Sequence, residues 1–387
     1  MSPPIDRPIR PIPLNVGGPI DPEHLVGREI ELARIFEAFT SVGVVLTGER
    51  RLGKTSLARL VERHAHGIGW DVVRQSAEGF TTLTDFSAAL VSRLEDASPR
   101  LRKAATSIME RSTFKALGLQ IGPASASRLL EDVVSSAVHA SQERLLLILD
   151  ELPVLARALE RADPGAGVAM LHVLRRQRQE HPERLRMLCL GSIGFHHAVG
   201  AEGRGALNDL DFQRLEALSQ PDASYLVACI FRHAEAPQTY ERAFASTIAD
   251  QVEGMPYYVH QLVASVLRDH PTNCGRDDVA GIVDAALTDP DDPWDLRHYV
   301  DRIEPYYGDD SPLARAVLDA IAATSSGLGL AELSAQMAAD RRLAPIDDER
   351  IRDVVHRLES DHYLVREGDR RRFAFELVRR AWIAHRS

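Results

Sequence analysis

The sequence predicts an α/β protein whose main domain is built on a parallel β-sheet, and three observations carry this prediction. Apolar segments typical of buried strands alternate with amphipathic segments typical of helices over residues 25–218. One of these strands runs directly into a glycine-rich loop, and another ends in the carboxylates Asp150 and Glu151. Strands joined by helices run parallel, and such a sheet binds ligands at the edge formed by its carboxyl ends.

The chain has 387 residues, which is enough for two or three domains with separate cores. No apolar run approaches the ~18–20 residues of a membrane span, and the N-terminal segment lacks the apolar stretch of a secretory signal. The cysteines Cys189, Cys229 and Cys274 follow no metal spacing, and Cys189, inside an apolar run, is expected to be buried. These features predict a cytoplasmic protein without membrane attachment. The net charge of −10 argues mildly against nucleic-acid binding, so a DNA-binding role depends on a local basic patch.

The glycine-rich loop follows an apolar strand at 42–47 and has the P-loop spacing of Gly48-x4-Gly53-Lys54-Thr55. Its glycines allow the backbone to turn N–H groups toward phosphate oxygens. Lys54 is expected to reach the β- and γ-phosphates, and the Thr55 hydroxyl to ligate Mg²⁺. A chance glycine-rich turn is the weaker alternative, because a helix pattern follows at once. The residues expected to bind nucleotide here are Gly48, Glu49, Arg50, Arg51, Leu52, Gly53, Lys54, Thr55 and Ser56.

The apolar strand at 144–150 ends in Asp150 and Glu151, which is the Walker B pattern. Asp150 is expected to hold Mg²⁺ through water, and Glu151 to act as the general base that polarises the attacking water. An acidic helix N-terminus explains the two carboxylates by themselves, but it does not explain the P-loop that precedes them. Together the two motifs predict a site for ATP and Mg²⁺.

Two further motifs frame the Walker motifs: a Val26-Gly27-Arg28-Glu29 box before the P-loop, and Gly254-x-Pro256 at the start of an apolar helix. In this order the motifs resemble the AAA+-related STAND and archaeal-type ATPases, relatives of the origin-recognition initiators. The resemblance extends from about Gly18 to the end of the chain. It implies a sheet core followed by a helical lid and a winged helix. It also implies that Val26, Gly27 and Arg28 lie against the adenine and ribose, and that Pro256 occupies the lid region near the nucleotide.

The same resemblance gives a role to Ser192, which ends the apolar strand after Walker B. In P-loop ATPases of the additional-strand type, a polar residue at this place senses the γ-phosphate. Ser192 is equally suited to cap the helix that follows, and both alternatives stay open. The lid carries Gly254-Met255-Pro256 where enzyme-like AAA+ proteins carry an arginine, and this departure fits a slow switch better than rapid hydrolysis.

We expect four regions along the chain. Residues 1–24 form a proline-rich arm that is extended along the core or disordered. Residues 25–218 form the ATPase domain, with an insertion at 82–142 that contains helices around a strand-like piece at 117–123. Residues 219–305 form the lid and a linker rich in proline and aspartate, and residues 306–387 form the winged helix. The strands expected in the ATPase domain are 42–47, 70–75, 144–150, 184–190 and 211–218.

The C-terminal region leaves two functions open. Acidic residues 347–349 at the start of its third helix would repel DNA phosphates, although acids are also favourable at a helix N-terminus. In the family that the chain resembles, winged helices also serve as protein-contact or lid-locking modules, and we favour that role over DNA binding. The partners expected are a protein or a second copy of the chain. The basic side chains that could contact DNA phosphates are Arg350, Arg352 and Arg357 on the helix and Arg366, Arg370, Arg371 and Arg372 on the wing.

The remaining candidates are weaker. The histidines at 64, 66, 196 and 197 are not spaced to share a helix face, so we expect surface residues rather than a metal site. Arg204, in a glycine-rich stretch, is a candidate arginine finger for a neighbouring subunit. The sequence thus predicts an ATP-binding, ATP-hydrolysing conformational switch. The alternatives are an initiator- or transposition-type ATPase that assembles on duplex DNA, and a signalling or defence switch whose sensor is a separate chain.

Overall fold

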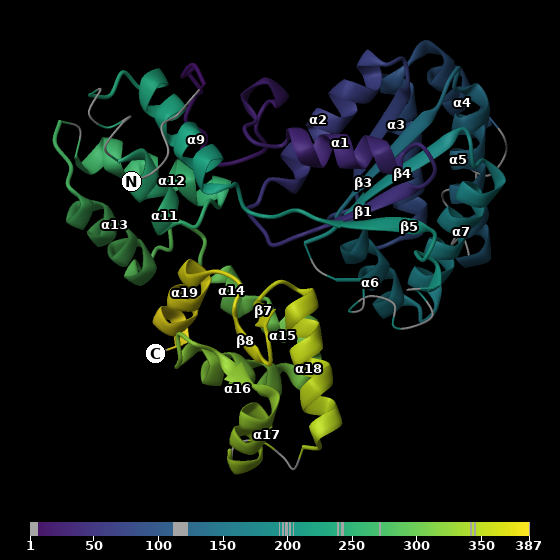
Figure 1. Ribbon diagram of the computed structural model, residues 1–387. Coiled ribbons are helices and arrows are strands. Elements are labelled where there is room, and N and C mark those ends of the chain that lie inside the picture. Colours follow the sequence, from purple (N-terminus) through teal and green to yellow (C-terminus); the bar gives the residue numbers. More distant parts are fainter. Residues whose placement is uncertain are drawn as a thin grey trace. The chain divides into compact units, whose positions relative to one another are not determined.

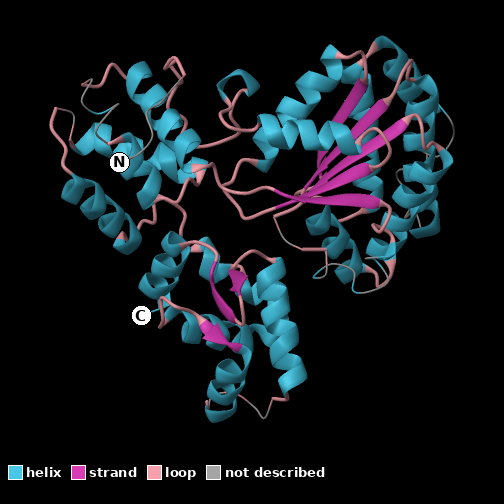
Figure 2. Cartoon of the chain, viewed as in Figure 1, coloured by secondary structure: helices cyan, strands magenta, loops and turns pink. Residues whose placement is uncertain are grey.

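The computed structural model describes residues 7–110, 123–192, 194, 195, 197, 200, 203, 205–237, 240, 244–270, 272–340, 343 and 346–386. The chain divides into two compact units. The sheet unit comprises Asp21–Gly48 and Lys54–Leu215, and the helical unit comprises Met1–Ile20, Glu49–Gly53 and Glu216–Ser387. Figure 2 shows a broad sheet in the former and a small one among the helices of the latter. Within the described ranges, no helix has the length and apolar character needed to span a bilayer.

The sheet unit is built around five parallel strands in the order β2-β3-β4-β1-β5 (Figure 1). The strand that leads into the P-loop, β1, lies between β4 and β5, and β4 separates it from β3. Since the strands run in one direction, the carboxyl ends of β1, β3 and β4 lie along the same edge. The strands, all close to their expected positions, are β1 (Gly43–Thr47), β2 (Asp71–Ser76), β3 (Leu145–Asp150), β4 (Leu185–Leu190) and β5 (Leu210–Arg214).

Helices connect the strands of the sheet unit and pack against the sheet. Every residue of β3 and β4 is buried, which explains why both strands are continuous apolar runs without alternation. The strand-like piece expected at 117–123 falls outside the described residues except for Pro123, which begins a helix. The helical elements of this unit are η1 (Pro22–His24), α1 (Glu29–Ala38), α2 (Lys54–Gly67), α3 (Leu83–Ala97), α4 (Pro99–Glu110), α5 (Pro123–Ala140), α6 (Leu152–Ala162) and α7 (Ala166–Glu180).

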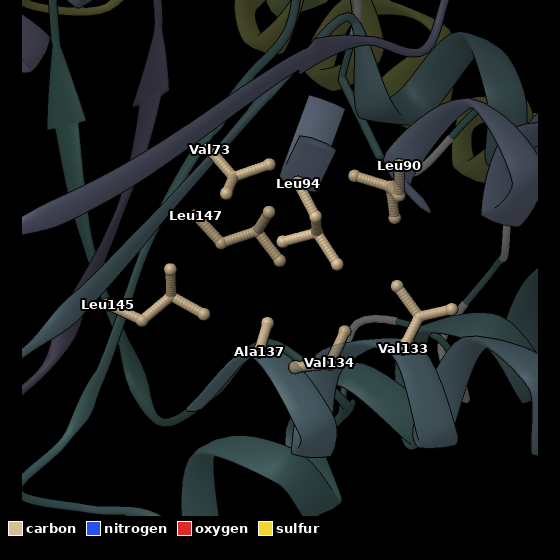
Figure 3. Close-up of a pocket in the computed structure, with 8 residues that line it drawn as sticks. All are labelled: Val73, Leu90, Leu94, Val133, Val134, Ala137, Leu145 and Leu147. Atoms are coloured by element: carbon tan, nitrogen blue, oxygen red, sulfur yellow. The ribbon is translucent and has the colours of Figure 1, made fainter. Parts of the chain in front are cut away.

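Aliphatic side chains from β2, β3, α3 and α5 surround a small space inside the core of this unit (Figure 3). Their ends point toward one another, and none of them carries a polar group. The space therefore belongs to the hydrophobic core and has nothing to orient a polar ligand. The residues that line it are Val73, Leu90, Leu94, Val133, Val134, Ala137, Leu145 and Leu147.

The helical unit begins with the elements expected for the lid. The first helix starts after Ser219, whose side chain accepts a hydrogen bond from the backbone N–H of Asp222. Cys189 of the sheet unit is buried, as predicted, and Cys229 and Cys274 of the helical unit are also free and buried. The helices of this part are α9 (Gln220–His233), α11 (Ala245–Gln251), α12 (Pro256–Asp269) and α13 (Arg276–Thr288).

The described part of the N-terminal arm packs on these helices. The Ile12 side chain is buried, and its backbone N–H donates to the Cys229 carbonyl at 3.1 Å. The Arg7 guanidinium lies 3.7 Å from the centre of the Tyr225 ring. The described part of the arm therefore lies against α9.

The expected linker is a packed part of the helical unit. It buries the side chains of Trp294 and Tyr299 and contains α14 (His298–Asp301), α15 (Ile303–Tyr307) and η3 (Gly308–Asp310). This stretch is buried because it contains large aromatic side chains. Its many proline and aspartate residues, by contrast, predict a linker.

The C-terminal region combines helices with an antiparallel sheet in the order β6-β8-β7. A side chain at Gly327 is excluded, because a Cβ there would lie 2.2 Å from the Arg371 carbonyl oxygen. The elements are α16 (Ser311–Ala322), β6 (Leu328–Gly329), α17 (Leu330–Ala339), α18 (Asp348–Ser360), β7 (Leu364–Glu367), β8 (Arg370–Phe373) and α19 (Glu376–Arg386).

One arginine that the sequence assigned to the surface of this region is buried. The Arg371 side chain is 9% exposed, and its Nε donates to Glu359 Oε1 at 3.0 Å. Side chains alternate between the two faces of a strand, so Arg371 points inward while Arg370 and Arg372 on either side do not. Arg371 is therefore not available to contact phosphates from this position.

Candidate nucleotide-binding site

The P-loop begins where β1 ends, at a position where a side chain would clash with the neighbouring backbone. Gly48 has φ 144°, and a Cβ there would lie 2.7 Å from the Leu215 carbonyl oxygen. Lys54 begins α2, and its buried amine donates to the Gly48 carbonyl at 2.8 Å. The first residues of α2, including Thr55 and Ser56, carry backbone N–H groups that no earlier turn of the helix satisfies. This end of the helix therefore favours an anion such as phosphate.

Thr55 and Asp150 are brought together from α2 and from the end of β3. The Thr55 hydroxyl donates to Asp150 Oδ2 at 2.8 Å. Burial raises the pKa of Asp150 above its ordinary value and the charge of Glu151 adds to the rise, whereas Thr55 and Lys54 oppose it. Hydroxyl and carboxylate oxygens are the ligands that Mg²⁺ prefers. These two side chains therefore fit a magnesium ion, and binding it requires the ionised form of Asp150.

Glu151 lies next to Ser192, as the order of the strands predicts. Ser192 donates to Glu151 Oε2 twice, from its backbone N–H at 3.1 Å and from its hydroxyl at 3.0 Å. Glu151 also has φ 54°, in the left-handed region that costs a residue with a side chain about 1–2 kcal/mol. Strained backbone of this kind is typical of functional sites. The strand end therefore turns the Glu151 carboxylate toward the end of β4.

The Val26-Gly27-Arg28-Glu29 box leads into α1 in the sheet unit, and Glu29 is the first residue of that helix. The side chains of Val26 and Arg28 are buried, and Gly27 has φ 65°. The Arg28 Nη1 donates to Glu31 Oε1 at 2.8 Å. The contact of this box with adenine and ribose stays a prediction.

The crest of the P-loop, residues 49–53, belongs to the helical unit. Glu49 is 1% exposed, and its Oε1 lies 3.1 Å from Arg302 Nη1 in a buried ion pair. The Arg50 backbone N–H also donates to Glu49 Oε1, at 2.8 Å. Arg51 has φ 68° and places its guanidinium 4.1 Å from the centre of the Tyr257 ring.

Two other residues of the crest, Arg51 and Leu52, are also held by the helical unit or buried. Arg51 forms an ion pair with Asp295, and the Leu52 side chain is buried. The partners of the crest, which are Arg302, Asp295 and Tyr257, could not be predicted from the sequence, because they lie far along the chain from the loop. One signal was available, since an acidic residue inside a phosphate-binding loop needs a cation nearby.

The Gly254-x-Pro256 turn is rigid in the structure. Gly254 has φ 69°, and a Cβ there would lie 2.3 Å from the Leu218 carbonyl oxygen. The Leu218 N–H donates to the Gly254 carbonyl at 3.0 Å, and Pro256 begins α12. The turn thus fixes α12 to the chain segment that leads into α9. A role for Pro256 at the nucleotide stays a prediction.

The weaker candidates gain no support as a metal site. His64 and His66 are exposed, and the described residues contain no group of three or more histidine, cysteine, aspartate or glutamate side chains that could hold a metal ion. His197 is partly buried. His196 and Arg204 lie outside the described residues.

Comparison with known proteins identifies the fold. No family profile and no curated protein sequence matches the chain. The structure is similar to the Walker-type ATPase of Pyrococcus abyssi, with a TM-score of 0.65 and 14% sequence identity over 96% of this chain and 99% of that one. It is also similar to the ORC2 protein of Aeropyrum pernix, determined as ADPNP–ADP complexes, with a TM-score of 0.54 and 15% identity over 95% of this chain and 97% of that one.

These likenesses confirm the predicted fold class, a P-loop α/β fold built on a parallel sheet. At such low identity they establish the fold, and the function has to be argued from the site itself.

Proposed function

We propose that the protein binds ATP with Mg²⁺ at the P-loop and hydrolyses it slowly, as a switch whose state depends on the bound nucleotide. The observation that carries this proposal is the meeting of three strand ends at one edge of the sheet. They bring Lys54 and Thr55 from the P-loop, Asp150 and Glu151 from β3, and Ser192 from β4 into one site. This set of residues matches the parts needed for phosphoryl transfer.

Each side chain has a role that follows from its chemistry. Lys54 supplies a positive charge for the β- and γ-phosphates, and Thr55 and Asp150 supply oxygen ligands for Mg²⁺. Glu151 accepts a proton from the attacking water or orients it. Ser192 fixes the Glu151 carboxylate through its hydroxyl and backbone N–H. When bound, Mg²⁺ neutralises charge on the transferring phosphate.

One contact in the site supports slow turnover. The Lys54 amine donates to the Gly48 carbonyl at 2.8 Å. Phosphate has to compete with this contact for the Lys54 charge, and the contact therefore acts against rapid hydrolysis, in agreement with a switch.

We propose that the C-terminal elements form a winged helix that contacts a protein partner or a second copy of the chain. The order of helices and short strands supports this, and so does the pairing of its basic side chains. Arg372 Nε donates to Glu367 Oε1 at 2.7 Å, Arg370 lies 3.3 Å from Glu332, and Arg350 lies 2.6 Å from Asp310. Arginines that are already paired with acids bind DNA phosphates less readily.

The test is ATP turnover by the purified protein and its Glu151→Gln variant, each with and without duplex DNA. We expect slow turnover in the wild type, loss of turnover with retained ATP binding in the variant, and no response to DNA. Turnover that rises with DNA and falls again at higher salt would replace the switch with the DNA-dependent alternative. Turnover that is equal in both proteins would remove Glu151 from the mechanism.

A further inference from the structure

The first residue of the P-loop crest carries a negative charge in a loop that is meant to bind phosphate. Glu49 follows Gly48 directly and its side chain is 1% exposed, so water cannot screen its charge. A carboxylate within a few ångströms of phosphate oxygens repels them. If the P-loop binds ATP, the charge of Glu49 has to be neutralised from within the protein.

Arg302 supplies the opposite charge. Its Nη1 lies 3.1 Å from Glu49 Oε1, and its Nη2 donates to Glu49 Oε2 at 3.3 Å. Only the Nη2 contact has the geometry of a hydrogen bond, and the Nη1 contact is a close approach of opposite charges. Burial acts to lower the pKa of Arg302, but Glu49 and the neighbouring tyrosines raise it well above the ordinary value. These interactions favour the charged form of Arg302.

Arg302 is itself held by residues that precede β7. Its Nε donates to the Tyr363 hydroxyl at 2.6 Å, and its Nη2 donates to the Asp361 carbonyl at 3.4 Å. The Tyr363 hydroxyl donates in turn to the Tyr299 carbonyl at 2.6 Å. The Tyr363 ring centre lies 4.3 Å from the guanidinium carbon, close enough for a cation–π interaction. A single arginine thus joins the crest of the P-loop to the C-terminal region.

A second bond makes this junction rigid on the C-terminal side. The Tyr307 hydroxyl at the end of α15 donates to Asp361 Oδ2 at 2.7 Å, and both side chains are buried. Arg302 is held by residues between α18 and β7, and these residues are bonded in turn to α15. Displacement of Glu49 would consequently break its bonds to an arginine that is fixed in place. Separating the partners of such a buried ion pair is strongly unfavourable, because it leaves an uncompensated charge inside the protein.

We propose that Arg302 is a positioning residue of the nucleotide site, which neutralises Glu49 so that phosphate can bind and connects the P-loop to the C-terminal region. This inference rests on the proposed binding of ATP. Without Arg302, the charge of Glu49 would oppose the phosphates. Without both charges, the loop would again accept phosphate, but it would no longer be connected to Tyr363.

A double-mutant cycle tests the proposal through the dissociation constant for ATP with Mg²⁺, measured by calorimetry on the full chain. We expect Arg302→Met to weaken ATP binding by roughly tenfold to a hundredfold. Arg302→Met with Glu49→Gln should restore the affinity to within about threefold of the wild type, because the two changes leave no unpaired charge. An unchanged affinity in Arg302→Met, or a double variant that binds as weakly as the single one, would overturn the proposal.

Control variants separate this outcome from misfolding and from failure of the proposed function. Arg178→Met removes another arginine with a 7% exposed side chain, which is paired with Asp209 at 2.7 Å, and it should lower stability without changing ATP affinity. Should Arg302→Met fail to fold, Tyr363→Phe removes only the hydroxyl that holds Arg302, and ATP affinity should fall by roughly threefold or more; an unchanged affinity would count against the proposal. A wild-type protein that does not bind ATP would refute the proposed function itself.

Discussion

The carboxylate of Glu151 accepts two hydrogen bonds from Ser192, one from its backbone N–H at 3.1 Å and one from its hydroxyl at 3.0 Å. Glu151 directly follows β3, and Ser192 lies two residues beyond the end of β4; these are neighbouring strands of the parallel sheet. The contact fixes the orientation of the residue proposed to activate water. Ser192 therefore acts on the proposed reaction through Glu151, whatever it contacts when nucleotide is bound.

This contact predicts that Ser192→Ala lowers the kcat for ATP by roughly tenfold, because a hydrogen bond to a charged group is lost. The dissociation constant for ATP should stay within about twofold, since the phosphate-binding groups of the P-loop are unchanged. Steady-state turnover and equilibrium binding measure the two quantities separately. Ser192→Thr, which keeps a hydroxyl, is the matched control and should retain most of the turnover. Equal turnover in the alanine variant and the wild type would show that the contact has no part in the reaction.

The glycines at the two ends of the P-loop are predicted to differ in their tolerance of a side chain. Gly48→Ala places a methyl group 2.7 Å from the Leu215 carbonyl oxygen, so we expect the free energy of unfolding to fall by roughly 2–4 kcal/mol. Gly53 also has positive φ, but nothing lies within 4 Å of the position of a Cβ. Gly53→Ala should therefore cost only about 1–2 kcal/mol from the backbone conformation. Denaturant unfolding measures the loss of unfolding free energy in both variants. A larger loss in Gly53→Ala than in Gly48→Ala would contradict this prediction.

The packing of the N-terminal arm predicts a pH-dependent stability. The Asn15 N–H donates to His260 Nδ1 at 3.1 Å, and burial lowers the pKa of His260 from 6.5 to about 4. Between these values the unfolded chain binds a proton on this side chain and the folded protein does not. Stability from this group is therefore present above about pH 6.5 and is lost as the pH falls toward 4, by about 1.4 kcal/mol per pH unit.

The variant that tests this is His260→Asn, whose side-chain oxygen can still accept the hydrogen bond but cannot bind a proton. We expect the wild type to lose about 2 kcal/mol more than the variant between pH 7 and pH 5, measured by denaturant unfolding. Burial also lowers the pKa of His298, but that contribution is common to both proteins and cancels in the difference. Parallel pH profiles for the two proteins would show that His260 is already accessible to protons in the folded state.

The sequence was sufficient to predict the parts of the fold that local patterns determine. The strand before Gly48 and the strand before Asp150 are apolar runs bounded by functional residues, and both lie where expected. Their common direction followed from the helices between them, and it correctly placed Glu151 near Ser192. These features depend on spacing along a short stretch of chain, which a single sequence displays directly.

Features that depend on distant residues could not be predicted in this way. Nothing in the spacing pairs Glu49 with Arg302, because the two are separated by more than 250 residues and meet only after the helical unit folds. The inward orientation of Arg371 depends on the register of β8, which a run of three arginines does not reveal. The burial of Trp294 in the expected linker is likewise a product of tertiary packing.

The central claim, that the P-loop binds ATP, is tested most directly by calorimetric titration of ATP with Mg²⁺ into the wild-type protein and its Lys54→Ala variant. Lys103→Ala removes an exposed lysine of α4 and is the matched control for the loss of a positive charge. The account predicts saturable binding to the wild type and the Lys103 variant, and a loss of binding in Lys54→Ala, because the buried Lys54 amine provides the charge at the phosphates. Equal affinity in all three proteins, or no binding to the wild type, would contradict the account.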